Sequence, residues 1–83
     1  SQISFMENKK TLNQVSIGSE VTVDSLSAVD TLLRKKLLSL GFIKGEKIRV
    51  VSIAPLGDPI NIEIKGYNLS LRKSEAKSVI LEN

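Results

Sequence analysis

Hydrophobic and polar residues alternate along several short segments of the chain, and a period of two predicts β-strands. Ile60, Ile62 and Ile64, separated by polar residues, give the clearest case. The predicted strands cover residues 20–26, 47–53, 60–65, 69–71 and 79–81. Within 47–53, apolar residues occupy both faces, so this strand is expected to be covered on both sides for part of its length.

A different period predicts one α-helix, over Ser27–Leu40. Apolar residues recur there at the three- and four-residue spacing of a single helix face. The predicted buried stripe consists of Val29, Leu32, Leu33, Leu37 and Leu40. Ser27 is the predicted N-cap, with Asp30 three positions later in a capping arrangement. Gly41, directly after the stripe, suits the left-handed residue that often ends a helix.

Short connections separate these elements. Thr11 is expected to cap a helical turn over residues 11–15, and two prolines bound a loop over 55–59. Residues 66–68 are expected to form a tight connection, and 74–77 a single helical turn. Five short strands with one helix after the first predict a small antiparallel barrel, although this pattern also fits an open α+β sheet.

The length of 83 residues predicts one small domain, over residues 11–83, behind a flexible tail over 1–10. Met6 is a candidate natural start, which would make Ser1–Phe5 a cloning remnant; the alternative is a natural tail. There is no cysteine to form a disulfide or bind a metal. No apolar run reaches the roughly 20 residues that span a bilayer, so a soluble cytoplasmic protein is expected.

Twelve basic and nine acidic residues give a net charge of +3, which favours anionic surfaces such as lipid headgroups or nucleic acid. The charge is well below that of a dedicated nucleic-acid-binding domain. Phe5, Phe42 and Tyr67 are the only aromatic residues, so there is little surface for base stacking.

The residue types argue against catalysis and against a bound metal or cofactor. There is no histidine or cysteine, and the carboxylates are scattered along the chain without an acid–base pair. Ferrous iron and zinc are held mainly by imidazole, thiolate and carboxylate ligands, of which only the last is present. Asp58 is the strongest candidate ligand because it lies in the 55–59 loop, but we interpret it as a turn residue that bonds nearby backbone. We therefore predict no enzyme activity, metal site or cofactor.

Three segments place Gly or Pro at turns, in a fixed order: Leu40-Gly41-Phe42-Ile43-Lys44-Gly45, Ala54-Pro55-Leu56-Gly57-Asp58-Pro59, and Gly66-Tyr67-Asn68-Leu69-Ser70-Leu71-Arg72 running on to Glu75-Ala76. In order and spacing these segments resemble the FeoA family, small cytoplasmic components of bacterial ferrous iron transport. The resemblance runs from about Thr11 to Glu82. It implies an SH3-like barrel with the helix packed against it.

The resemblance also implies a partner, the membrane protein FeoB, which carries a cytosolic GTP-binding domain and a ferrous iron permease. Docking to its cytosolic part would place this protein at the inner face of the membrane through its partner, without inserting into the bilayer. One alternative is the SH3-like C-terminal domain of an iron- or manganese-dependent repressor. Another is a free-standing nucleic-acid-binding barrel, which net charge alone supports.

The candidate partner-binding residues are Leu56, Arg34, Lys35, Lys36, Leu38 and Tyr67. Leu56 lies at the tip of the Pro-bounded loop, and we expect this loop to lie beside the helix cations. For Lys36 there are two alternatives. The side chain extends along the barrel edge so that its charge reaches solvent, or it bonds a carboxylate or phosphate of a partner. The predicted strand at 79–81 could also pair with a second copy, so a homo-oligomer is possible.

Overall fold

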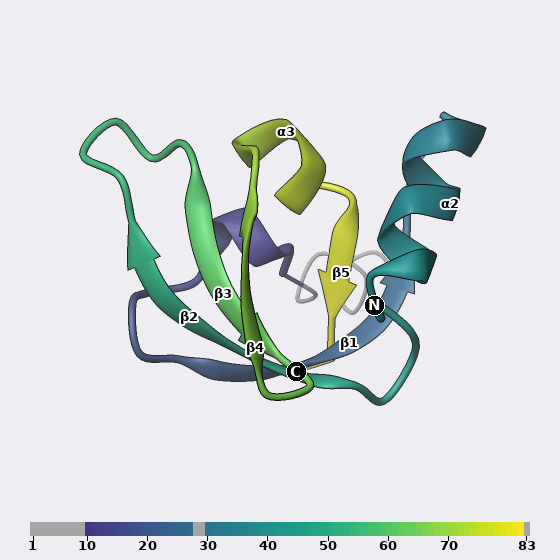
Figure 1. Ribbon diagram of the computed structural model, residues 1–83, viewed down its shortest axis with the longest axis horizontal. Helices are drawn as coiled ribbons and strands as arrows, with labels where there is room; N and C mark the ends of the chain where they lie inside the picture. Colours follow the sequence, from purple (N-terminus) through teal and green to yellow (C-terminus); the bar gives the residue numbers. More distant parts are fainter. Residues whose placement is uncertain (1–9, 28–29, 83) are drawn as a thin grey trace, which may run out of the picture.

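The computed structural model describes residues 10–27 and 30–82. In chain order the elements are η1 (Leu12–Gln14), β1 (Glu20–Leu26), α2 (Thr31–Ser39), β2 (Lys47–Ile53), β3 (Ile60–Ile64), β4 (Tyr67–Leu71), α3 (Lys73–Ala76) and β5 (Val79–Leu81). The five strands form one curved antiparallel sheet in the order β4-β3-β2-β1-β5 (Figure 1). This confirms the prediction of a mainly β fold with one main helix after the first strand. Most of the predicted tail, residues 1–9, lies outside the described residues.

Strand β3 lies at the centre of the core, and along it the alternation of apolar and polar residues matches the alternation of buried and less buried side chains. Ile60, Ile62 and Ile64 are all buried, while Asn61 and Glu63 are on the opposite face of the sheet. The other buried apolar residues come from all the remaining elements and, for Phe42, from the α2–β2 connection: Leu12, Val23, Leu37, Phe42, Ile48, Val50, Leu71, Ala76, Val79 and Leu81.

The prediction that β2 is covered on both sides is wrong. Val51 is 42% exposed, and the pairing of β2 with β3 shifts between Val50 and Ser52. A β-bulge at this point places an extra residue in β2, so the alternation is out of phase after Val51. The bulge turns Ile53 toward the core beside Ile60, which explains apolar residues at both odd and even positions.

The turn between β3 and β4 lies slightly earlier than the predicted connection at 66–68. Lys65 and Gly66 both have positive φ angles, 54° and 84°, and Ile64 pairs directly with Tyr67. A two-residue hairpin with positive φ at both positions has the geometry that matches the twist of the flanking strands. Tyr67 is therefore the first residue of β4.

Helix α2 begins at Thr31 rather than Ser27, because Asp30 is the N-cap. The backbone N–H of Leu32 donates to Oδ1 of Asp30 over 2.9 Å. The predicted buried stripe is also too broad. Leu37 is fully buried and Leu33 and Leu40 pack against the core, but Leu32 is 76% exposed. The helix thus contacts the sheet along a narrow line; Val29 lies outside the described residues.

The end of α2 confirms the role predicted for Gly41. Its φ is 105°, the N–H of Phe42 donates to the carbonyl of Leu37 over 3.1 Å, and its own N–H donates to Leu38 over 3.1 Å. This bond pair is the Schellman motif. Phe42 and Leu37, which that motif brings together, are both fully buried.

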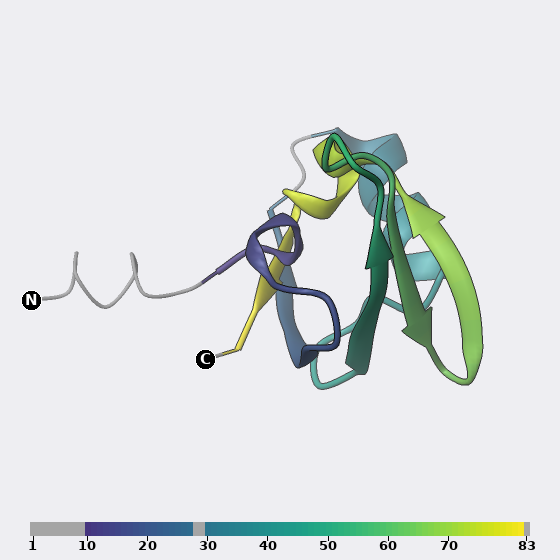
Figure 2. The same cartoon turned by 90° about the vertical axis from the view of Figure 1, so that its left-hand side faces the viewer.

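The outer edge of β5 is occupied, contrary to the prediction of an exposed edge at 79–81. Thr11, which precedes η1 as predicted, forms a bridge with Ile80, and the N–H of Leu81 donates to the carbonyl of Lys10 over 2.8 Å. Figure 2 shows the N-terminal segment against this strand. The sheet's other outer strand is β4.

Candidate functional site

Three elements gather at one end of the molecule: α2, α3 and the loop over residues 54–59 that joins β2 to β3 (Figures 1 and 2). We call these elements, with the N-cap Asp30 and the flanking Arg72 and Lys77, the helical end. Helix α3 connects the other two elements. The N–H of Lys73 donates to Oδ1 of Asp58 over 3.0 Å, and Nζ of Lys36 lies 2.6 Å from Oε2 of Glu75.

Asp58 therefore bonds backbone, as interpreted, but not that of its own turn. Its partner is an N–H fifteen residues later, in the first turn of α3. The first N–H groups of a helix have no partner within the helix. Asp58 satisfies one of them and fixes the loop against α3.

The structure separates the two halves of the predicted partner-binding patch. Leu56 is 91% exposed at its loop, and Arg34 and Lys35 are exposed on α2, with Nη1 of Arg34 donating to the carbonyl of Leu26 over 3.3 Å. Helix α3 lies between the loop and α2 (Figure 1). The expected direct neighbourhood of Leu56 and the helix cations is wrong, although they share one end of the molecule.

Lys36 forms an ion pair within the chain and does not extend freely along the barrel edge. Its hydrogen bond holds the pKa of the Glu75 carboxyl below the ordinary value, while partial burial of Glu75 acts in the opposite direction. The N–H of Arg72 also donates to Glu75, over 2.9 Å, and further lowers that pKa. The Lys36–Glu75 pair thus joins α2 to α3.

Leu38 and Tyr67 are partly exposed, at 43% and 44%. The hydroxyl of Tyr67 donates to the carbonyl of Leu40 over 2.8 Å. This carbonyl belongs to the C-cap of α2, where the last carbonyl groups have no partner within the helix. Tyr67 therefore joins β4 to the end of α2, and its ring remains available as a contact surface.

Sequence reasoning missed the contribution of α3 and its flanks to this end. Arg72, Lys73 and Lys77 are exposed, and they lie in α3 or at its caps; α3 lies between the loop and α2 (Figure 1). Only the cations that cluster in sequence, at Arg34–Lys36, form a local pattern. The Asp58–Lys73 hydrogen bond, which aligns α3 with the loop, joins residues too distant in sequence for a local pattern to reveal it.

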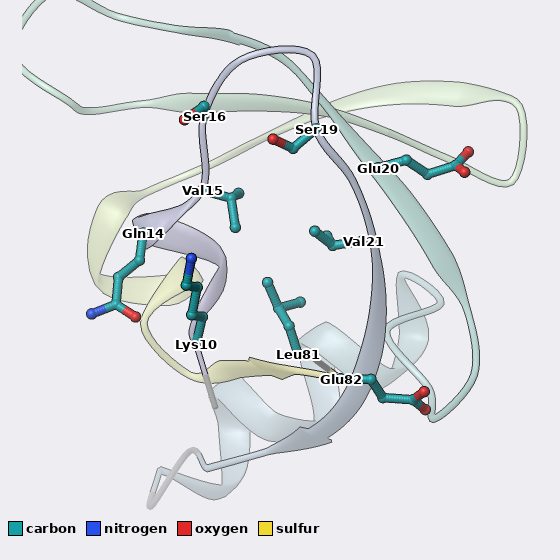
Figure 3. A pocket seen from close by; sticks show the side chains of 9 residues that line it. All are labelled: Lys10, Gln14, Val15, Ser16, Ser19, Glu20, Val21, Leu81 and Glu82. Carbon is teal, nitrogen blue, oxygen red and sulfur yellow. The ribbon is translucent and has the colours of Figure 1, made fainter. Parts of the chain in front are cut away.

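A pocket of about 320 Å³ lies elsewhere, between the N-terminal segment and strands β1 and β5 (Figure 3). Val15, Val21 and Leu81 provide its apolar residues. The polar residues that line it are Lys10, Gln14, Ser16, Ser19, Glu20 and Glu82. The amine of Lys10 lies on one side of the opening and the carboxylates of Glu20 and Glu82 on the other (Figure 3), so its titratable groups do not converge.

A second, shallower pocket of about 440 Å³ lies over β2, β3 and β4, lined by Val51, Ser52, Asn61, Asn68, Leu69 and Ser70. Neither pocket contains a predicted partner-binding residue. Across residues 10–27 and 30–82, no group of three or more potential metal-ligating side chains is present. In the same part of the chain, no helix is long and apolar enough to cross a membrane.

Comparison with protein families identifies residues 10–83 as a FeoA domain. The chain belongs to the FeoA domain family. A Fe(2+) transport protein A/Fe(2+) transporter FeoB fusion protein of Porphyromonas gingivalis is 43% identical over 51 residues. The match covers 61% of this chain but only 6% of the fusion protein.

Solved FeoA structures share the fold. A FeoA-like protein of Clostridium acetobutylicum is 40% identical with a TM-score of 0.81, covering 89% of this chain and 85% of the other. The FeoA of Stenotrophomonas maltophilia, solved with zinc, is 30% identical with a TM-score of 0.79, covering 88% and 89%. That protein is described as an SH3-domain protein and a candidate activating factor for bacterial ferrous iron transport. The SH3-like fold predicted for this FeoA domain is therefore confirmed.

A manganese-dependent transcriptional repressor also superposes, with a TM-score of 0.80 over 89% of this chain and 41% of the other. At 19% identity, this likeness concerns the fold alone.

The three segments that carry the family resemblance have structural roles in this FeoA domain. Gly41 ends α2, Asp58 fixes the loop to α3, and Gly66 forms the β3–β4 turn. Leu56 is an exception, because its side chain is exposed and contributes little to packing.

Proposed function

We propose that this FeoA domain is a non-catalytic accessory protein of ferrous iron transport. It docks to the cytosolic part of a FeoB-type GTPase and permease and modulates the activity or assembly of the transporter. One observation carries the proposal: a relative joins FeoA and FeoB in a single chain. Fusion gives the two parts a high effective concentration, which is useful where they act on one another. The protein would work at the cytoplasmic face of the membrane.

Docking alone would not change transport. A binding partner shifts a conformational equilibrium only if it binds the two states with different affinities. We propose that the contact uses Leu56, Arg34 and Lys35, with smaller contributions from Lys36, Leu38 and Tyr67. Leu56, Arg34 and Lys35 should contribute most to the contact, because Lys36 already bonds Glu75 and the hydroxyl of Tyr67 already bonds Leu40. Exposed apolar anchors tend to supply affinity, while charges at the rim mainly tune association rate and salt dependence.

Leu56→Asp tests the proposal directly. With the side chain 91% exposed, the substitution should leave the melting temperature nearly unchanged. Binding to the FeoB-type transporter of the same organism, purified in detergent, should weaken by about tenfold or more. Arg34→Glu with Lys35→Glu should weaken the same binding mainly at low salt.

Ile17→Asp is the matched control, because Ile17 is also exposed, at 59%, and lies in the turn before β1, outside the helical end. It should bind the transporter like the parent protein. The docking site is wrong if Leu56→Asp binds normally and restores iron uptake in a strain that lacks the native protein. Loss of folding in Leu56→Asp would instead show that Leu56 packs in the core.

The repressor-type alternative is supported by fold likeness alone. An electrophoretic mobility shift with duplex DNA, at low and physiological salt, would detect nucleic-acid binding, because phosphate-driven affinity falls steeply with salt. We expect no shift at physiological salt.

A further inference from the structure

The charge of the molecule is concentrated at the helical end. Its six cations are Arg34, Lys35, Lys36, Arg72, Lys73 and Lys77, and its three carboxylates are Asp30, Asp58 and Glu75. They leave a charge of +3, which equals the net charge of the whole chain. The rest of the chain has six cations and six carboxylates and is neutral overall. The protein is thus electrically polar, with one basic end.

The carboxylates of this end are all bonded to its own elements. Asp30 accepts from the N–H of Leu32 and Asp58 from the N–H of Lys73, while Glu75 accepts from Lys36. Lys35, Lys73 and Lys77 are exposed, and among the described residues they form no ion pair. These three lysines therefore remain available to a negatively charged surface.

The two most exposed large apolar residues of the described chain lie at the same end. Leu56 is 91% exposed in the loop and Leu32 is 76% exposed in the first turn of α2, and α3 lies between the two elements (Figure 1). Cations interspersed with exposed leucines are typical of protein surfaces that bind anionic membranes.

We propose that the helical end binds directly to anionic phospholipid headgroups, with Leu56 and Leu32 reaching the headgroup boundary. Nucleic acid is a poorer fit, because the helical end has no aromatic residue on which bases could stack. A protein partner would need a separate apolar pocket for each of Leu32 and Leu56, because they lie on different elements. A fluid bilayer can accommodate both side chains without preformed pockets. This inference goes beyond docking to the transporter. Because Leu56 belongs to both contacts, lipid binding and transporter docking would alternate at this residue.

Co-sedimentation with lipid vesicles tests the inference without any transporter present. The probe is vesicles of phosphatidylcholine with about 30 mol% phosphatidylserine, compared with phosphatidylcholine alone. The protein should bind the anionic vesicles at low salt and dissociate from them as salt is raised to about 0.5 M. It should not bind the neutral vesicles. Failure to bind anionic vesicles at low salt would overturn the inference.

Two charge-reversal pairs show whether binding is oriented. Lys73→Glu with Lys77→Glu alters the helical end, while Lys44→Glu with Lys47→Glu makes the same change of net charge near the α2–β2 connection at the opposite end (Figures 1 and 2). The first pair should reduce vesicle binding by at least about tenfold and the second by less than about threefold. If the two pairs reduced vesicle binding equally, net charge alone would attract the protein to the vesicles, and the inference would be wrong.

The leucines have a matched test of their own. Leu56→Ser should weaken binding to anionic vesicles several-fold. Ile17→Ser, at a residue that is also exposed but lies outside the helical end, should not. Equal effects would exclude leucine contact with lipid. If the parent protein ignores vesicles but Lys73→Glu with Lys77→Glu weakens binding to the FeoB-type transporter, the basic end contacts protein only. In that case the lipid inference fails while the proposed function stands.

Discussion

Strand β3 and helix α2 were both predicted from apolar periodicity, but they bury their apolar residues to different degrees. Ile60, Ile62 and Ile64 of β3 are each at most 2% exposed. In α2 the exposure of leucines runs from 0% at Leu37 to 76% at Leu32. β3 lies between β2 and β4, so pairing on both sides fixes which face is covered. α2 packs against the core along one line, and it joins α3 through the Lys36–Glu75 ion pair.

The difference shows what periodicity can and cannot specify. In a paired strand, a shift of one residue would move every side chain to the other face, so the register is strongly determined. A helix can rotate by small angles and still bury part of an apolar stripe. The width of the buried stripe thus depends on the neighbours of the helix, and α2 exposes a leucine that is then available for binding.

Ile62→Ala should give the largest effect and tests the β3 side of this comparison. Ile62 is fully buried at the centre of β3, so removing three of its side-chain carbons should lower the free energy of unfolding by about 2–4 kcal/mol. Urea denaturation followed by circular dichroism measures the change. A loss below about 1 kcal/mol would show that β3 is not the centre of the core.

Leu32→Ala is the matched change on α2. With 76% of the side chain exposed, it should alter stability by no more than about 0.5 kcal/mol. A loss similar to that of Ile62→Ala would mean that Leu32 is packed, and the contrast between the two elements would disappear.

Gly41→Ala should have an intermediate effect, because it acts on the junction that holds α2 against the sheet. Its φ of 105° is strained for alanine, and a Cβ would lie 2.7 Å from Cε of Lys65. We expect a loss of about 1–3 kcal/mol in unfolding free energy, measured by urea denaturation. In a Lys65→Ala background, the part of this loss that comes from the contact with Lys65 should vanish, and the part that comes from the unfavourable φ should remain.

Gly18→Ala provides the control for dihedral strain. Gly18 has a similar φ of 89°, but nothing lies within 4 Å of its added Cβ. Gly18→Ala should therefore lower the free energy of unfolding by less than Gly41→Ala does. Equal losses would show that contact with Lys65 contributes nothing.

The sequence predicted the strands better than it predicted the connections between them. The bounds of β1, β2 and β5 agree with the alternating segments because alternation is a local property, and β3 ends one residue earlier than predicted. The bulge at Val51 was missed because it depends on the pairing of β2 with β3. The start of α2 was misplaced because Ser27 and Asp30 are both good N-cap residues, and only Asp30 bonds the helix.

The candidate site could be predicted only in part for the same reason. Exposure of Leu56 follows from its place between two prolines in a loop, and Arg34 and Lys35 follow from the polar side of the helix. The role of α3 depends on two contacts between distant segments, Asp58 with Lys73 and Lys36 with Glu75. Neither contact leaves a local pattern in the sequence.

The last prediction concerns the Lys36–Glu75 pair, which links α2 to α3 and whose effect on stability should also be small. Because the pKa of Glu75 is lowered in the folded protein, its carboxylate adds stability above the unfolded pKa. That contribution is lost as pH falls through the lower, folded pKa, so stability should decline below about pH 5. The Lys36 side chain is 55% exposed, so the ion pair should contribute less than about 1 kcal/mol to the free energy of unfolding at neutral pH.

Lys36→Met should therefore lower stability slightly at pH 7 and flatten its decline between about pH 5 and pH 3, measured by urea denaturation at each pH. Some of the decline should persist, because the N–H of Arg72 still donates to Glu75. Lys77→Met removes an exposed cation adjacent to α3 without touching this pair, and should keep the parent slope. If Lys36→Met also keeps the parent slope, the ion pair does not hold α2 to α3. The width of the buried stripe on α2 would then depend on the Leu37–Phe42 packing and on the bond from Tyr67 to Leu40.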